Sequence, residues 1–93
     1  MKELVSTNRR GDNMKTLDKL NIGYKANVKT VLGEGQIRRR LFDMGITPGV
    51  EIYLRKAAPL GDPIQISLRG YELTLRKTEA SLVVIEGEEK VLW

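Results

Sequence analysis

The pattern that most constrains the fold is a series of short runs in which apolar and polar residues alternate. Three such runs cover residues 50–55, 64–69 and 71–76, and residues 26–32 alternate with one imperfect side. An alternation with a period of two is typical of β-strands with one buried face. Residues 82–85 are continuously apolar, as expected for a strand with both faces covered. The sequence therefore predicts five short strands.

One helix is predicted between the first two strands, over residues 36–44. Ile37, Leu41 and Met44 recur at i, i+4 and i+7, which places them on one stripe of a helix. Gly45 follows at the position where a left-handed C-terminal cap is expected. This segment is the only clear helix in the chain, apart from a single turn expected over residues 77–81.

Glycine and proline residues separate the predicted strands. Arg69 and Gly70 join two strands as a tight hairpin, because Gly70 adopts a positive φ at little cost. Residues 58–63 form a turn-rich loop between the second and third strands. Since a small closed barrel removes most exposed sheet edges, we expect a mainly β fold: a small five-stranded SH3-like barrel with one short α-helix between the first two strands.

The chain of 93 residues is predicted to hold one domain, at residues 14–86. Residues 1–13 lack a sustained apolar period and are expected to form a disordered leader, and residues 87–93 a C-terminal tail. No uncharged run exceeds seven residues, so no membrane-spanning segment is expected. The N-terminus also lacks the apolar core of a signal peptide, and a cytoplasmic location is therefore expected.

The chain contains no cysteine and no histidine. This excludes disulfides, zinc fingers, iron–sulfur clusters and Ser-His or Cys-His catalytic arrangements. We therefore expect neither an enzyme nor a bound cofactor. Asp43, Asp62, Glu72 and Glu79 are the carboxylates left as candidate metal ligands, and oxygen ligands alone do not select Fe²⁺. No specific metal site is expected, although a weak transition-metal-binding regulatory role stays open as an alternative.

Three segments carry a resemblance to a known family. Residues 39–49 read RRLFDMGITPG, residues 58–63 read APLGDP, and residues 70–80 read GYELTLRKTEA. In order and spacing they resemble three signature segments of the FeoA family, and the resemblance covers about residues 14–86. It implies an SH3-like barrel that acts as a small cytoplasmic accessory to FeoB, the membrane GTPase that carries ferrous iron in bacteria. The predicted function is therefore a protein–protein interaction module for FeoB.

The loop at residues 58–63 is the first candidate contact with this partner. Pro59 and Pro63 restrict the loop, which lowers the entropy cost of binding. Leu60 is then either an apolar tip that inserts into the partner or a side chain that folds back onto the barrel. Pro59, Leu60 and Gly61 are the predicted contact residues.

The helix supplies the second candidate contact. Successive helix residues lie about 100° apart, so Arg38, Arg39 and Arg40 do not form one patch. Arg39 is expected to pair with Asp43 at i+4. Arg39 and Arg40, with Met44 at the end of the helix, are predicted to contact an acidic surface of the GTPase; the alternative is a solvated helix face.

Three further features complete the sequence-based predictions. Tyr53 and Arg55 are second-rank contact candidates on an exposed strand face, and Arg76 and Glu79 are expected to hold the connector onto the barrel.

The net charge of +4 makes RNA binding the alternative function, but no nucleic-acid partner is expected, because the few aromatic residues form no stacking row. Direct membrane insertion is not expected either, and short barrel edges permit a homodimer.

Overall fold

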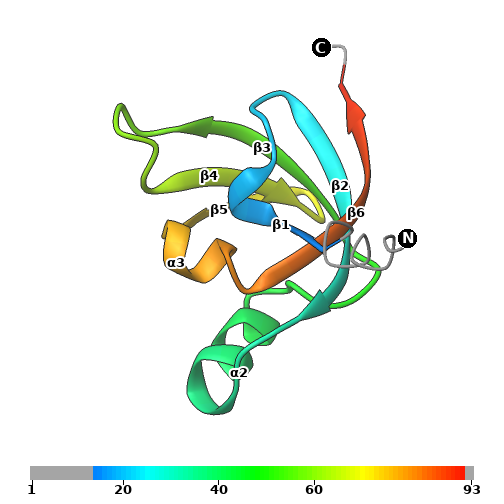
Figure 1. Ribbon diagram of the computed structural model, residues 1–93, viewed down its shortest axis with the longest axis vertical. Helices are drawn as coiled ribbons and strands as arrows, with labels where there is room; N and C mark the ends of the chain where they lie inside the picture. Colours follow the sequence, from blue (N-terminus) through cyan, green and yellow to red (C-terminus); the bar gives the residue numbers. More distant parts are fainter. Residues whose placement is uncertain (1–13, 92–93) are drawn as a thin grey trace, which may run out of the picture.

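The computed structural model describes residues 14–91, and these residues form one bent sheet with short helical segments at its margins (Figure 1). The strands are β1 (Lys15–Thr16), β2 (Tyr24–Val31), β3 (Glu51–Ala57), β4 (Ile64–Leu68), β5 (Tyr71–Leu75) and β6 (Val83–Lys90). The helical segments are the 3₁₀ turn η1 (Leu17–Lys19), α2 (Gly35–Asp43) and α3 (Lys77–Ala80). The predicted helix is therefore α2, and the predicted single turn is α3.

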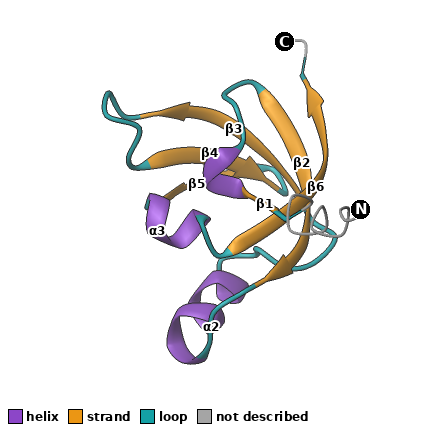
Figure 2. Cartoon of the chain, viewed as in Figure 1, coloured by secondary structure: helices purple, strands orange, loops and turns teal. Residues whose placement is uncertain are grey.

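The strands form an antiparallel sheet in the order β1-β6-β2-β3-β4-β5. Figure 2 shows β3 and β4 lying across β2 and β6, so that the sheet bends back on itself like a barrel. The β2–β6 ladder shifts register twice and the β3–β4 ladder once. Such irregularities increase the local twist and bend of a strand, which allows a small sheet to enclose a core.

The predicted alternation matches the burial of β3 and β4, whereas Tyr71 at the start of β5 is exposed. In β3 the buried residues are Ile52 and Leu54, and in β4 every second residue from Ile64 to Leu68 is buried. The core contains Leu17, Leu20, Ala26, Val28, Val31, Leu41, Ile46, Val50, Ile52, Leu54, Ile64, Ile66, Leu68, Leu75, Ala80, Val83 and Ile85. Burial of each large aliphatic side chain contributes about 1.5–3 kcal/mol, so the inward faces of the strands hold the barrel together.

All five predicted strands are present, and the sheet has additional pairing at both ends of the described chain. The two residues of β1 pair with Ile85 and Val84 of β6. Strand β6 continues to Lys90, beyond the predicted domain limit at residue 86, and pairs with β2 there. Residues 87–90 of the predicted tail therefore belong to the sheet. The predicted leader, residues 1–13, lies outside the described residues, as do residues 92–93.

Helix α2 ends in the predicted glycine cap. Gly45 has a φ of +95°, its N–H donates to the Phe42 carbonyl at 2.9 Å, and the Ile46 N–H donates to the Leu41 carbonyl at 3.0 Å. This pair of bonds is a Schellman motif. Leu41 is fully buried, whereas Ile37, a member of the predicted apolar stripe, is 37% exposed. The helix is therefore anchored at its C-terminal end.

Tyr71 of β5 packs closely on this cap. Its hydroxyl donates a hydrogen bond to the Met44 carbonyl at 2.5 Å. A Cβ atom added to Gly45 would lie 2.6 Å from the Tyr71 hydroxyl oxygen, closer than van der Waals contact allows. Gly45 is thus required both for its positive φ and for the space that it leaves.

We predict that Gly45→Ala lowers the free energy of unfolding by about 2–4 kcal/mol, because alanine has to hold a positive φ and displace the Tyr71 hydroxyl. Gly70→Ala is the matched control: Gly70 has a φ of +87° but open space around it. Its loss should be about 1–2 kcal/mol. Urea unfolding of both variants measures the difference, and equal losses would contradict the close contact with Tyr71.

Candidate partner-binding surface

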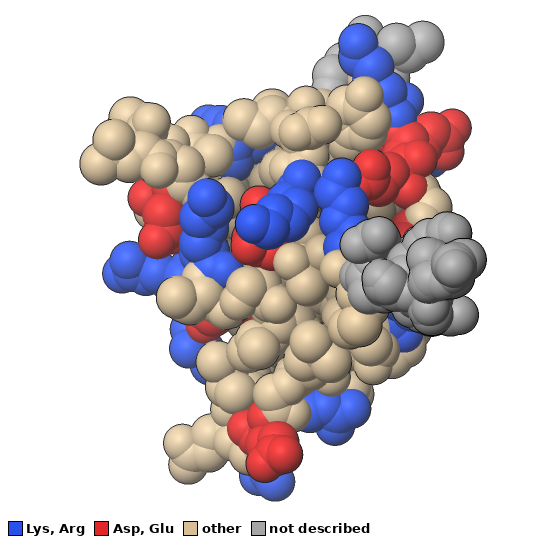
Figure 3. Space-filling view, in the orientation of Figure 1, with Lys and Arg blue, Asp and Glu red and all other residues tan. Residues whose placement is uncertain are grey.

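The loop between β3 and β4 presents Leu60 at its tip. The Gly61 N–H donates to the Ala58 carbonyl at 2.7 Å, which closes a turn over Pro59 and Leu60. The Ala58 N–H donates to the Pro63 carbonyl at 2.9 Å and closes the base of the loop. Leu60 is 94% exposed. Of the two predicted arrangements, the structure therefore has the exposed apolar tip, and Figure 3 shows this loop projecting at the upper left.

A carboxylate fastens the loop to the rest of the molecule. Asp62 accepts a hydrogen bond at 2.9 Å from the backbone N–H of Lys77, the first residue of α3. Together with the two proline rings and the two bonds within the loop, this contact restricts how Leu60 is presented. A restricted loop loses less conformational entropy when it binds a partner.

A second carboxylate joins α3 to α2. Glu79 is 6% exposed, and one of its oxygens accepts the Arg76 backbone N–H at 3.0 Å. Its other oxygen lies 3.0 Å from the guanidinium of Arg40, whose side chain is 66% exposed. Glu79 thus holds the connector on the barrel, in agreement with the prediction, but it does so by binding the Arg76 backbone and the Arg40 side chain.

The three successive arginines of α2 have different surroundings, as their spacing predicts. The Arg38 Nε donates to the Val31 carbonyl at 3.2 Å, and its guanidinium lies 4.8 Å from the centre of the Phe42 ring. Arg40 binds Glu79. Arg39 is exposed and makes no ion pair within residues 14–91, so the predicted Arg39–Asp43 pair is absent there.

The structure does not bring all the predicted contact residues together. In Figure 1, α2 and the β3–β4 loop lie at different ends of the barrel, and α3 lies between them. Arg39 and Arg40 are on α2, and Met44 is partly buried at its end, where its carbonyl binds Tyr71. The predicted surface therefore consists of two separate patches, the loop around Leu60 and the exposed side of α2.

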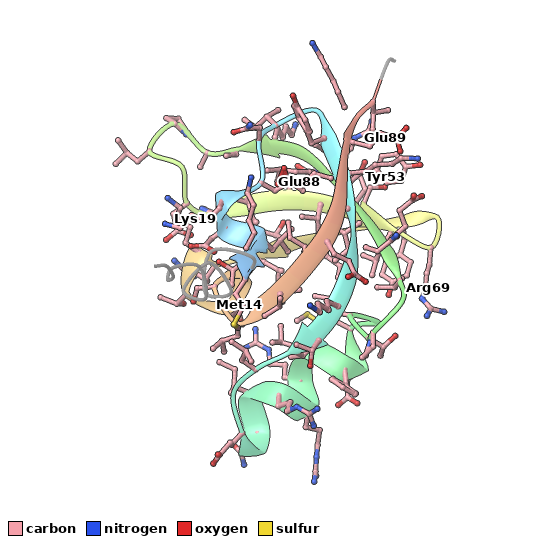
Figure 4. The ribbon with its side chains drawn as sticks, turned by 45° about the vertical axis from the view of Figure 1, so that its right-hand side comes forward. Met14, Lys19, Tyr53, Arg69, Glu88 and Glu89 are labelled. Atoms are coloured by element: carbon pink, nitrogen blue, oxygen red, sulfur yellow. The ribbon has the colours of Figure 1, made fainter. Side chains whose placement is uncertain are left out.

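Tyr53 and Arg55 lie on β3 in a third area. Figure 4 shows Tyr53 beside Glu89, away from the β3–β4 loop. The Lys25 ammonium lies 5.8 Å from the Tyr53 ring centre and 3.3 Å from Glu51. The hydrogen bond and the charge of Glu51 raise the pKa of Lys25 above its usual value. Tyr53 thus belongs to a network of charges on the barrel wall, and Arg55 is also in contact with neighbouring groups.

Three of the four carboxylates considered as metal ligands, Asp62, Glu72 and Glu79, make hydrogen bonds within the protein. Among residues 14–91 no three histidine, cysteine, aspartate or glutamate side chains gather where they could hold a metal ion. Asp62 and Glu79 bind backbone amides, and Glu72 accepts a hydrogen bond from the Gln65 amide.

Within residues 14–91, no helix is long and apolar enough to cross a membrane.

Comparison with known proteins identifies the family. Residues 15–87 match the FeoA domain. The chain belongs to the FeoA family. A FeoA-like protein from Clostridium acetobutylicum superposes with a TM-score of 0.74 at 44% sequence identity, over 78% of this chain and 85% of that one. FeoA of Stenotrophomonas maltophilia, solved in complex with zinc and described as an SH3 domain protein, gives a TM-score of 0.74 at 28% identity, over 82% and 96%.

A curated relative of the chain is a fusion protein. The Fe(2+) transport protein A/Fe(2+) transporter FeoB fusion protein of Porphyromonas gingivalis is 33% identical over 70 residues, which are 75% of this chain. The chain spans 8% of the length of that fusion protein. These matches confirm the predicted family and the predicted SH3-like fold.

We predict that Glu79→Ala lowers the free energy of unfolding by about 2–4 kcal/mol, because the Arg76 N–H and the Arg40 guanidinium lose their acceptor. Glu79→Gln keeps the size of the side chain and an oxygen for the Arg76 N–H, so its loss should be about 1 kcal/mol. Denaturant unfolding compares the two variants. If Glu79→Ala were as stable as the wild type, α3 would not depend on this carboxylate.

Proposed function

We propose that this protein docks on a FeoB-type iron transporter and that the Leu60 loop makes the main contact. The observation that supports this most directly is the 94% exposure of Leu60 on a loop fixed by hydrogen bonds. Burial of one leucine side chain contributes about 1.5–3 kcal/mol. A leucine that the fold leaves in water therefore supplies binding energy only when a partner covers it.

The fused relative supports the choice of partner. In the Porphyromonas gingivalis protein, the FeoA and FeoB parts belong to one polypeptide. A covalent link keeps two modules at an effective concentration of about a millimolar when the linker is short. A covalent link therefore favours contact between the FeoA and FeoB parts. Where the two parts are separate chains, binding has to come from an interaction surface instead.

Arg39 is the proposed second contact. It extends from the exposed side of α2 and has no ion pair within the described part of the chain, so its guanidinium is available to an acidic group of the transporter. Arg40 and Met44 lie on the same helical segment, but they also hold α2 in place through Glu79 and Tyr71. Tyr53 and Arg55 would join the contact only if the partner also reached the wall formed by β3.

We predict that Leu60→Glu lowers the affinity for the detergent-solubilised FeoB-type transporter at least about tenfold, which corresponds to about 1.4 kcal/mol. The measurement is copurification of the two proteins, with GDP and with a GTP analogue. Because Leu60 is exposed, thermal unfolding of the variant should match that of the wild type.

Ile22→Glu is the matched control for this experiment. Ile22 is 58% exposed in the turn between η1 and β2, so the substitution makes the same chemical change at another exposed site. It should leave copurification unchanged. Undiminished retention of Leu60→Glu, or an equal loss in both variants, would argue against docking through the loop.

A further inference from the structure

Three exposed lysines lie around the Leu60 loop, and we call them the lysine collar: Lys19, Lys56 and Lys77. The Lys77 ammonium lies 3.9 Å from the position that a Cβ atom on Gly61 would occupy. Lys56 lines a shallow groove of about 340 Å³ at the base of the loop, next to Ala58 and Pro63. The collar therefore has one member beside Gly61 and one at the base of the loop.

Lys19 completes the collar from η1. This turn packs against α3, the segment to which the loop is fastened. Figure 4 shows Lys19 on the side of the molecule where the β3–β4 loop meets the barrel, and Figure 3 shows Lys and Arg atoms below that loop, with Asp and Glu atoms among them. The exposed apolar tip is thus accompanied by exposed lysines.

The collar lysines make no ion pair within residues 14–91, in contrast to Lys15 and Lys25 elsewhere on the barrel, which pair with glutamates. The nearby acids are engaged in other contacts. Asp62 accepts the Lys77 backbone N–H, and Asp18 accepts the Thr16 hydroxyl. Both carboxylates keep their charge, but neither forms an ion pair with the collar within residues 14–91, and the exposed ammonium groups can meet charges outside the chain.

We propose that the transporter site for Leu60 is an apolar pocket ringed by carboxylates, which meet the lysine collar when the loop docks. This inference rests on the proposed function and adds the chemistry of the partner surface. Charges at the rim of an interface mainly set the association rate and its salt dependence, while a buried apolar residue at the centre supplies most of the affinity. In this proposal Leu60 is the central apolar residue that supplies affinity, and the lysine collar is the charged rim that sets the association rate and its salt dependence.

The test compares two double variants that change the net charge equally, from +4 to 0. Lys56→Glu/Lys77→Glu reverses the charge of two of the three collar lysines, and Lys29→Glu/Lys90→Glu reverses the charge of two exposed lysines of β2 and β6. Binding to the purified transporter is measured at about 50 mM and about 500 mM NaCl, since salt screens exposed charges. The collar variant should raise Kd about tenfold at low salt and less than about threefold at high salt, and the control variant less than about twofold at both.

The outcomes separate this inference from the proposed function. If the wild type binds and Leu60→Glu does not, but the collar and control variants lose equal affinity, the loop docks and the acidic ring is refuted. If the wild type itself does not bind the transporter, both proposals fall.

A lipid surface is the other source of negative charge, and a second arm of the experiment tests it. Vesicles of phosphatidylcholine with about 30% phosphatidylserine, without the transporter, attract exposed lysines on proteins that bind membranes. We expect no cosedimentation of the wild type with these vesicles. Cosedimentation that is lost in Lys56→Glu/Lys77→Glu would overturn the protein pocket and assign the collar to the bilayer.

Discussion

The arrangement of the surface depends on two carboxylates that bind the start of α3. A helical segment of four residues has no stability of its own in water, because so few residues do not repay the entropy of forming a first turn. Asp62 and Glu79 accept the N–H groups of Lys77 and Arg76, which begin this segment. The same carboxylates reach outward, Asp62 as part of the Leu60 loop and Glu79 to Arg40 of α2. The Leu60 loop and the exposed side of α2, the two candidate contact patches, are therefore both connected to α3.

The strands could be predicted where burial imposes a period on the sequence. In β3 and β4 the core selects apolar residues at every second position, and in β6 it selects a continuous apolar run, Val83 to Ile85. The glycines at 45 and 70 mark turns that need a positive φ. Strand β1 could not be found in this way, because two residues carry no period. The last part of β6 is exposed and rich in glutamate, so its strand structure comes from pairing with β2 and leaves little hydrophobic signal.

The candidate site was predictable in outline but not in its geometry. The APLGDP motif located the loop. A leucine between two prolines, however, is compatible with a side chain that points inward or outward. In the structure, the loop closed by these backbone hydrogen bonds has the Leu60 side chain pointing outward. Local spacing favoured pairing of Arg39 with Asp43, a contact worth only a few tenths of a kcal/mol. The pair that forms joins Arg40 to a buried glutamate far along the chain, and no local pattern encodes such a contact.

Helix α2 differs from the barrel in how it is held. Leu41 is its only fully buried side chain, and Phe42 is only partly buried against the core. Its other described contacts are polar bonds made by Arg38 and Arg40 and the C-terminal cap. Elements with few buried apolar contacts open locally at a lower free energy than the core strands around them. The backbone amides of α2 are therefore expected to exchange with solvent through brief unfolding of the helix alone. We therefore expect two levels of stability in this molecule: a helix that opens locally at a low free energy, and a barrel that stays folded while it does so.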